Sequence, residues 1–229
     1  MGEEGQFTVS RDWKERLSVS RDLGTGFAAP GGEFTRALYE WSLTPGGNFL
    51  PRLLEKRRVM ELGAGMMPYG YALAASCEAR NFVAVEPFYA DKQKASIQAM
   101  IEDAGQTLPR IPYKVEGRDM LDYLKDEADN LLCVVACGIE DCILPSAEYR
   151  KKVEGEIYRV LEQDTFFLSS HSDLKPQGLR TVEMTFRRPA NPRVEDRLRL
   201  HGSKQAYEKY GEILEIAKLS VSSLGNSKA

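Results

Sequence analysis

The chain has 229 residues, of which 42% are hydrophobic and 28% are charged. This balance is typical of a globular protein and excludes collagen-like, coiled-coil and wholly disordered classes. Acidic side chains (34) outnumber basic ones (31), which disfavours nucleic-acid binding because that needs a concentrated positive field. No stretch approaches 18 apolar residues, and the first residues lack the pattern of a secretory signal, so we expect a cytoplasmic protein without a membrane span.

The first 55 residues differ in texture from the rest. Two turn-rich patches bracket one helical candidate, in which Phe34, Leu38 and Trp41 recur at i, i+4 and i+7. We expect residues 1–55 to form an N-terminal extension with a helical cap beside the main domain. The first twenty residues have few apolar positions and are expected to be disordered, or ordered only by a ligand.

From residue 56 on, short apolar runs alternate with segments of helical periodicity. The runs begin at Arg58, Asn81, Pro112, Asn130 and Thr165. Gly105 marks the end of one helical segment and Ser146 the start of another. Beyond the fifth run, two segments separated by PANP predict a hairpin, and a last apolar stripe predicts a helix. The pattern predicts an α/β fold over residues 56–229, with helices on both faces of a mostly parallel, twisted sheet.

The cysteines carry no recognisable metal or redox motif. They stand at Cys77, Cys133, Cys137 and Cys142. Their spacing fits neither the paired CxxC of a zinc site nor a redox dithiol. Cys133 and Cys137 have the same parity in one apolar run, so we expect them to pack as small hydrophobic side chains. The sequence therefore predicts no metal site.

The first apolar run leads into a glycine-rich turn, Val59-Met-Glu-Leu-Gly-Ala-Gly-Met-Met-Pro-Tyr-Gly70. Glycine lets the backbone approach a ligand closely, and the carboxyl ends of the strands form the ligand crevice of an open parallel sheet. A nicotinamide or flavin fingerprint needs a glycine where Pro68 stands, and a phosphate-binding P-loop needs a lysine that this turn lacks. The turn therefore favours a nucleotide-like ligand without a pyrophosphate, and a nicotinamide-dependent oxidoreductase becomes the less favoured alternative.

The stretch from about Arg58 to Ser170 resembles the Rossmann-like (class I) S-adenosylmethionine-dependent methyltransferases. Its Glu61-Leu-Gly-Ala-Gly65 is similar to the family's first motif, which meets the methionine and ribose parts of the cofactor. By the same resemblance, Glu86 is the ribose-binding acid, Asp119-Met120 meets the adenine, and Cys137 faces the methyl end. The resemblance implies the cofactor-binding residues Glu61, Gly63, Ala64, Gly65, Gly70, Glu86, Pro87, Asp119, Met120 and Cys137.

Elementary chemistry favours the same ligand. S-adenosylmethionine has no phosphate, but it has two ribose hydroxyls, an α-amino group and a sulfonium cation, to which carboxylates at strand ends are complementary. Two of the acids also have structural explanations, because Glu86 suits a helix N-terminus and Asp119 suits a helix cap. Met66-Met67-Pro68 is bulkier than the family's usual loop. A non-catalytic, cofactor-binding module of the same fold therefore remains an alternative.

Candidate residues for the acceptor are fewer. His171 closes the fifth run and is a candidate general base. Glu140 and Asp141 follow the fourth run and are candidates for orienting a substrate or for capping the next helix. Tyr39 and Trp41 are candidates for stacking on a substrate, although packing of the cap against the sheet is favoured.

The resemblance implies methyl transfer by in-line displacement at the sulfonium methyl. Family members that methylate base amino groups carry Asn/Asp-Pro-Pro-Tyr/Phe after the fourth strand, where this chain has Ala136-Cys-Gly-Ile-Glu140. From Lys175 to Leu200, seven basic side chains face three acidic ones, which predicts a solvated hairpin face or a site for an anionic substrate. We therefore expect a small-molecule acceptor beneath the N-terminal cap, with a protein side chain as the second choice.

Overall fold

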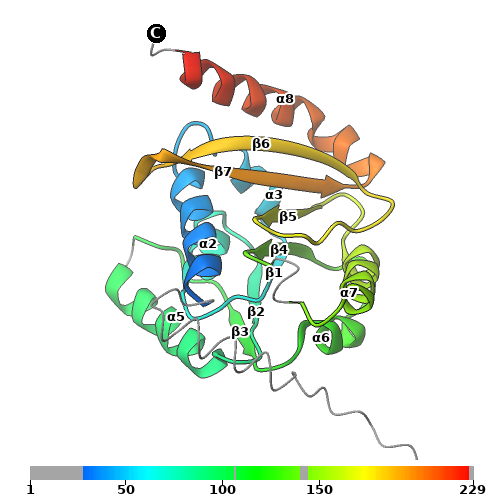
Figure 1. The fold of residues 1–229 in the computed structure, drawn as a ribbon. Helices are drawn as coiled ribbons and strands as arrows, with labels where there is room; N and C mark the ends of the chain where they lie inside the picture. Colours follow the sequence, from blue (N-terminus) through cyan, green and yellow to red (C-terminus); the bar gives the residue numbers. More distant parts are fainter. Residues whose placement is uncertain (1–27, 106, 140–143, 227–229) are drawn as a thin grey trace, which may run out of the picture.

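The computed structural model describes residues 28–105, 107–139 and 144–226, and its central feature is a seven-stranded sheet (Figure 1). The sheet has the order β3-β2-β1-β4-β5-β7-β6. Its strands are β1 (Arg58–Leu62), β2 (Asn81–Val85), β3 (Tyr113–Glu116), β4 (Cys133–Cys137), β5 (Phe166–Ser170), β6 (Arg180–Arg188) and β7 (Asn191–Gly202). The helices are α2 (Ala28–Ser42), α3 (Leu50–Leu54), α4 (Tyr69–Ser76), α5 (Ala90–Ala104), α6 (Met120–Asp126), α7 (Ala147–Val160) and α8 (Lys204–Asn226).

The strand directions confirm the predicted sheet. Strands β1 to β5 pair in parallel, whereas β7 pairs antiparallel with both β5 and β6. The two antiparallel steps turn β6 back to the direction of β5. The carboxyl ends of β1 to β5 therefore meet at one edge, where an open α/β sheet places its ligand crevice. The predicted C-terminal hairpin and helix are present as β6, β7 and α8.

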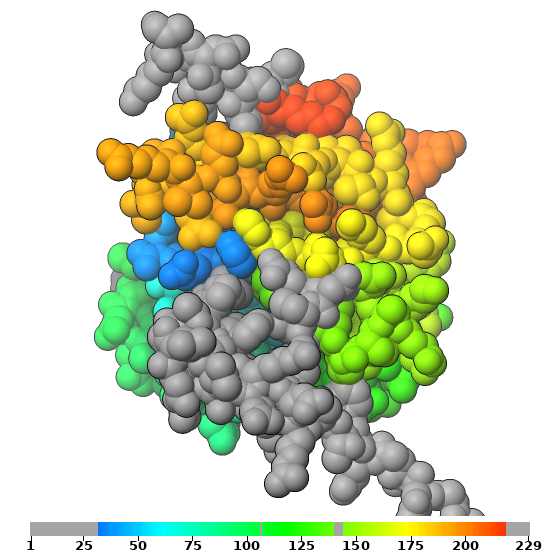
Figure 2. Space-filling model, in the orientation of Figure 1, coloured from blue at the N-terminus to red at the C-terminus, as the bar shows by residue number. Residues whose placement is uncertain are grey.

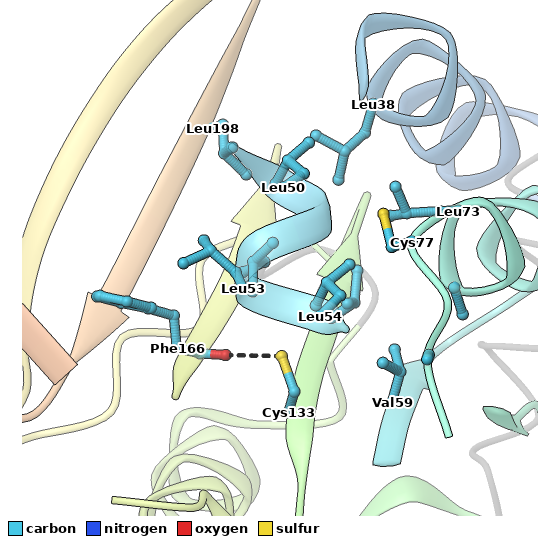
Figure 3. Packing of buried hydrophobic residues seen from close by; sticks show 14 of the residues in the cluster. Leu38, Leu50, Leu53, Leu54, Val59, Leu73, Cys77, Cys133, Phe166 and Leu198 are labelled. Carbon is cyan, nitrogen blue, oxygen red and sulfur yellow. Dashed lines mark hydrogen bonds between the residues drawn. The ribbon is translucent and has the colours of Figure 1, made fainter. Parts of the chain in front are cut away.

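Helices cover both faces of the sheet and form two buried clusters. One cluster joins α2, α3, α4, α5 and α8 to one face, and the other joins α6 and α7 to the opposite face. Strands β4 and β5 are buried at every position, as expected for strands covered on both sides. Figure 3 shows part of the first cluster, where Leu50, Leu53 and Leu54 of α3 pack near Leu38 and Val59.

The predicted helical cap is α2, and it packs directly on the sheet. Leu38 is fully buried, and Trp41 stacks on Phe186 of β6 with 4.3 Å between ring centroids. Side chains of α2 and α3 belong to the same buried cluster as β1 and β4. The expectation for the first twenty residues lies outside the described part of the chain.

Two predicted helix boundaries are confirmed by their geometry. Gly105 follows α5 with φ of 57°, a left-handed conformation that glycine adopts readily. Ser146 caps α7 by accepting a hydrogen bond from the backbone N–H of Tyr149 at 3.1 Å. Within the three described ranges, no helix is both long enough and apolar enough to cross a membrane.

Candidate functional site

The glycine-rich turn lies at the carboxyl end of β1. Gly63 and Gly65 have φ of 63° and 64°, which favours glycine because a side chain is strained there. The backbone N–H groups of Gly63 and Ala64 donate to the carbonyl of Val85 at 2.9 and 3.3 Å. These bonds hold the turn against the end of β2, so the predicted ligand loop and the next strand end lie side by side at one edge of the sheet.

Glu86 follows β2, and its side chain binds the backbone of this turn. Its Oε2 accepts a hydrogen bond from Gly65 N–H at 2.8 Å, and its Oε1 accepts from Phe88 and Tyr89 N–H at 2.9 and 3.3 Å. Burial raises the pKa of Glu86, and the backbone donors oppose that rise. A carboxylate offers about four acceptor positions, so these three bonds leave about one. Phe88 and Tyr89 directly precede α5, so Glu86 stands just before that helix, and both the helix-terminus role and the ribose role remain predictions.

Glu61 of β1 is buried between α2 and α4. Its Oε1 accepts a hydrogen bond from Thr35 Oγ1 at 2.8 Å, whereas its Oε2 has no hydrogen-bond partner within the described part of the chain. Burial raises the pKa of Glu61 to about 8, so the carboxyl is mostly neutral at pH 7. A Cβ on Gly70 would lie 1.9 Å from Glu61 Oε2. Gly70 is therefore explained by close packing against Glu61, and a direct role of either residue with a ligand stays a prediction.

Asp119 caps α6 from the end of the loop after β3. Its Oδ1 accepts hydrogen bonds from the backbone N–H groups of Leu121 and Asp122 at 2.8 and 3.3 Å. Its Oδ2 accepts from the hydroxyl of Tyr149, on α7, at 2.7 Å. Met120 begins α6 and packs against the second buried cluster. Asp119 is half-buried at the carboxyl end of β3.

Cys137 ends β4 and is buried, which together with the nearby carboxyl of Glu61 raises the pKa of its thiol to about 12. After Cys137, Gly138 N–H donates to the carbonyl of Ser170 at 2.9 Å and joins the ends of β4 and β5. Pro87 is half-buried beside Glu86. The candidate residues Glu140 and Asp141 lie outside the described residues.

Helix α2, on one face of the sheet, also reaches the glycine-rich turn. Thr35 contacts Glu61, and a Cβ on Gly32 would lie 2.6 Å from Cγ of Met67, so α2 packs closely on the Met66-Met67-Pro68 loop. Tyr39 stacks on Tyr69 at the start of α4, with 6.3 Å between ring centroids. Trp41 is buried on Phe186 and therefore has the packing role that the sequence favoured. The contacts of Gly32 with Met67 and of Thr35 with Glu61 join distant segments, and no local sequence pattern indicates them.

His171 follows β5 with φ of 48° and lies against α2. Its ring stacks on Phe34, with centroids 3.8 Å apart and planes 12° apart. Its Nε2 lies 2.9 Å from Oδ1 of Asp196, on β7, and Asp196 also binds Arg188 of β6. The sequence placed Asp196 and Arg188 on a solvated hairpin face. That interpretation is wrong for Asp196, which is 1% exposed.

The hairpin itself carries paired charges. Figure 2 shows part of α2 at the surface beside the β6–β7 hairpin. A hollow of about 830 Å³ at the hairpin end is lined by Trp41, Pro45, Arg187, Arg188 and Lys218 among others. Arg187 pairs with Glu195 at 3.5 Å, and Arg188 pairs with Asp196 at 2.6 Å. Two of the basic side chains of the hairpin are therefore held in ion pairs, and a role of the basic excess toward an anionic substrate stays a prediction.

Comparison with known proteins finds similar structures only. No protein-family model matches the chain, and no curated protein matches it. The chain is similar to a Burkholderia thailandensis 1,6-didemethyltoxoflavin-N1-methyltransferase solved with 1,6-didemethyltoxoflavin and S-adenosylhomocysteine, with 12% identity, a TM-score of 0.51 and coverage of 84% of this chain and 86% of that chain. A Geobacter sulfurreducens methyltransferase has 13% identity, a TM-score of 0.48 and coverage of 87% and 92%.

A third similar structure is longer than this chain. A candidate S-adenosyl-L-methionine-dependent methyltransferase from Methanococcus maripaludis has 16% identity and a TM-score of 0.42, and the match covers 69% of this chain but only 61% of that one. At these identities the likeness is one of fold.

Proposed function

From the fold of the class I S-adenosylmethionine-dependent methyltransferases, which this chain has, we propose that the protein transfers the methyl group of S-adenosylmethionine to a small molecule. The observation that carries this proposal is the hydrogen bond from the backbone N–H of Gly65 to the carboxylate of Glu86, at the carboxyl ends of β1 and β2. It combines a turn in which Gly63 and Gly65 carry no side chain with a carboxylate that has about one acceptor position left. A cofactor with hydroxyl donors and no phosphate suits that combination.

The neighbouring strand ends supply the remaining contacts. Glu86 would accept a ribose hydroxyl, while Asp119 and Met120 would meet the adenine at the start of α6. The turn at Gly63 would receive the methionine part. Cys137, at the end of β4, would lie toward the methyl group. These assignments follow the resemblance of the sequence, and they are supported by the common edge to which β1, β2 and β4 bring these residues.

S-adenosylmethionine supplies, when bound, a methyl group on a sulfonium that an acceptor displaces in line. The chain's contribution is to hold the acceptor and the methyl carbon collinear at near-attack distance and to keep water out. Helix α2 is suited to keeping water out, because Thr35 bonds to Glu61 and Gly32 packs closely on Met67 beside the glycine-rich turn. The position of this helix favours a small-molecule acceptor, and the similar Burkholderia structure is a 1,6-didemethyltoxoflavin-N1-methyltransferase with 1,6-didemethyltoxoflavin bound.

A binding titration tests the cofactor assignment. Calorimetric titration with S-adenosylmethionine compares the native chain, Glu86→Ala and Glu102→Ala, the last being an exposed acid on α5. We expect Glu86→Ala to lose about 1.5–3 kcal/mol for a lost hydrogen bond to a charged group, which is about 10- to 150-fold in Kd. Glu102→Ala should bind normally. Unchanged affinity in a folded Glu86→Ala protein would reject the ribose assignment.

A turnover assay separates the remaining functions. The protein is incubated with methyl-labelled S-adenosylmethionine and with either the low-molecular-weight or the protein fraction of a cell extract. S-adenosylhomocysteine together with labelled small molecules supports the proposal, whereas labelled protein identifies a protein methyltransferase. Binding without turnover of either fraction would indicate a cofactor-binding module. Binding of a nicotinamide dinucleotide in place of S-adenosylmethionine would indicate an oxidoreductase.

A further inference from the structure

His171 and Asp196 form a carboxylate–histidine pair at the edge of the sheet that holds the proposed cofactor site. Nε2 of His171 lies 2.9 Å from Oδ1 of Asp196. An ionised carboxylate accepts hydrogen bonds only, so Nε2 carries the proton and Nδ1 carries the lone pair when the ring is neutral. Among the described residues, Nδ1 makes no hydrogen bond, and the side chain is 33% exposed. Within that part of the chain, the pair therefore leaves one basic ring nitrogen without a hydrogen bond.

The carboxylate of Asp196 is held in a fixed orientation. It is 1% exposed and accepts two hydrogen bonds from Arg188, from Nε at 2.6 Å and from Nη2 at 3.1 Å. A buried charge is tolerated only when it is paired in this way. Arg188 lies over the ring of Phe34 at 5.3 Å, and Phe34 stacks on His171. The four side chains thus fix one ring orientation.

The second histidine shows what a purely structural role looks like in this chain. His201 is buried, and both of its ring nitrogens are occupied, by the hydroxyls of Ser169 at 3.0 Å and Thr181 at 2.9 Å. Burial lowers the pKa of His201 to about 4. His171 differs in each respect, because it is partly exposed, bonded to a carboxylate, and open at one nitrogen.

The location of His171 connects it to the proposed methyl end. Ser170, the residue before it, accepts the hydrogen bond from Gly138 N–H that joins the ends of β4 and β5. Two consecutive residues of α2, Phe34 and Thr35, contact His171 and Glu61 respectively. The histidine therefore lies under the same helix, and at the same end of the sheet, as the glycine-rich turn.

We propose that His171 is the general base of the methyl transfer and that Asp196 and Arg188 are its positioning residues. The acceptor is then a small molecule with a protic nucleophile, an O–H or N–H group, rather than a thioether or a tertiary amine. This inference rests on the proposed methyltransferase function.

The proposed step balances without a further reactant. Nδ1 of His171 takes the proton of the acceptor O–H or N–H, and the freed electron pair of the acceptor forms the new bond to the methyl carbon. The carbon–sulfur bond breaks, and its electron pair stays on sulfur, which gives neutral S-adenosylhomocysteine. The imidazolium is stabilised by the Asp196 carboxylate until it releases the proton to water.

Three variants of the full chain test the base. His171→Asn removes the base but suits a positive φ, because asparagine is enriched in that conformation. Asp196→Asn uncouples the ring, and Glu195→Gln is the matched control, since Glu195 is an exposed neighbour paired with Arg187. The probe is methyl-labelled S-adenosylmethionine with the low-molecular-weight fraction of a cell extract, and the readouts are label transfer, cofactor affinity and melting temperature.

We expect His171→Asn to slow transfer by about 10²- to 10⁴-fold with unchanged cofactor affinity. Asp196→Asn should slow transfer at least tenfold and Glu195→Gln should not.

Chemical rescue distinguishes a base from a structural ring. His171→Gly suits the same backbone conformation and leaves space beside Phe34, so added imidazole should restore part of the lost rate. An undiminished transfer rate in folded His171→Asn protein would overturn the inference and leave the methyltransferase function standing. A methyl group found on an acceptor atom that carried no proton would do the same. Absence of transfer in both fractions with the native chain would overturn both.

Discussion

Glu61 on β1 and Glu86 after β2 are two buried carboxyls one strand apart, and their surroundings differ. Glu61 accepts one side-chain hydrogen bond, from Thr35, and its second oxygen has no partner among the residues that the structure describes. Glu86 accepts three hydrogen bonds from backbone N–H groups. Burial raises the pKa of both, to about 8 for Glu61, while the backbone donors oppose the rise at Glu86. The ionised form is therefore better supported at Glu86.

The difference assigns the two acids separate tasks. Backbone N–H donors favour a carboxylate, and a carboxylate attracts the hydroxyl donors of a ribose. A neutral carboxyl packed against Thr35 and Gly70 instead joins α2, β1 and α4. The resemblance groups Glu61 with Glu86 as ligands of one cofactor, whereas their environments make Glu86 the stronger candidate for direct contact.

The largest expected effect is a dependence of the free energy of unfolding on pH, which comes from Glu61 and tests its contrast with Glu86. Because the folded state raises the pKa of Glu61 from 4.5 to about 8, it binds this proton more tightly than the unfolded state. The contribution of Glu61 to the free energy of unfolding should therefore decline as pH rises from about 4.5 to about 8, by up to about 1.4 kcal/mol per unit, and level off above pH 8. Urea unfolding between pH 5 and 9 measures this decline in the free energy of unfolding.

Glu61→Gln isolates that contribution, since glutamine is neutral at every pH. The difference in stability between the variant and the native chain should grow in favour of the variant as pH rises to about 8. Glu102→Gln, at an exposed site, should follow the native chain throughout. Parallel curves for Glu61→Gln and the native chain would mean that Glu61 is already ionised in the folded protein.

The sequence predicted the elements well because their signals are local. Apolar runs separated by helical stripes indicated the parallel sheet, and PANP indicated the hairpin between β6 and β7. Strand ends are local features too, so the turn at Gly63–Gly65 stood out from its glycines, and the family resemblance then singled out the acids Glu86 and Asp119. Their arrival at one edge follows from the parallel pairing of β1, β2 and β3.

Contacts between distant segments could not be predicted in this way. Thr35 meets Glu61 across 26 positions, and His171 meets Asp196 across 25. One signal for Asp196 was present, because it shares the parity of Leu198 and Leu200 on β7, and all three are buried. An acid on the apolar face of a strand indicates a buried partner, here Arg188 and His171.

The second prediction tests the close packing of Gly70 against Glu61. Gly70→Ala places a Cβ 1.9 Å from Glu61 Oε2 and 3.1 Å from Phe82 Cζ, so we expect a loss of about 1–3 kcal/mol in the free energy of unfolding. The control is Gly155→Ala on α7, where a Cβ meets nothing within 4 Å. It should stabilise the protein by about 0.5–1 kcal/mol. Chemical denaturation of both variants measures the contrast.

The close contact with Glu61 explains this expected loss, so a double variant tests the reason. Glu61→Ala removes the carboxyl that the new Cβ would strike. In that background, Gly70→Ala should cost less than it does in the native chain, which appears as a favourable coupling in a double-mutant cycle. An equal cost in both backgrounds would show that Glu61 does not set the size limit at position 70.

The smallest effect concerns Asp119, the acid that stands between the two extremes. It accepts two backbone N–H bonds and one side-chain bond, from the hydroxyl of Tyr149. Tyr149→Phe should cost about 0.5–1.5 kcal/mol in the free energy of unfolding, while Tyr158→Phe, at a residue 54% exposed, should cost close to nothing. Losing the hydroxyl frees an acceptor position on Oδ2, so an adenine amino group should bind no more weakly. Weaker binding of S-adenosylmethionine to Tyr149→Phe would place the tyrosine, rather than Asp119 alone, at the adenine.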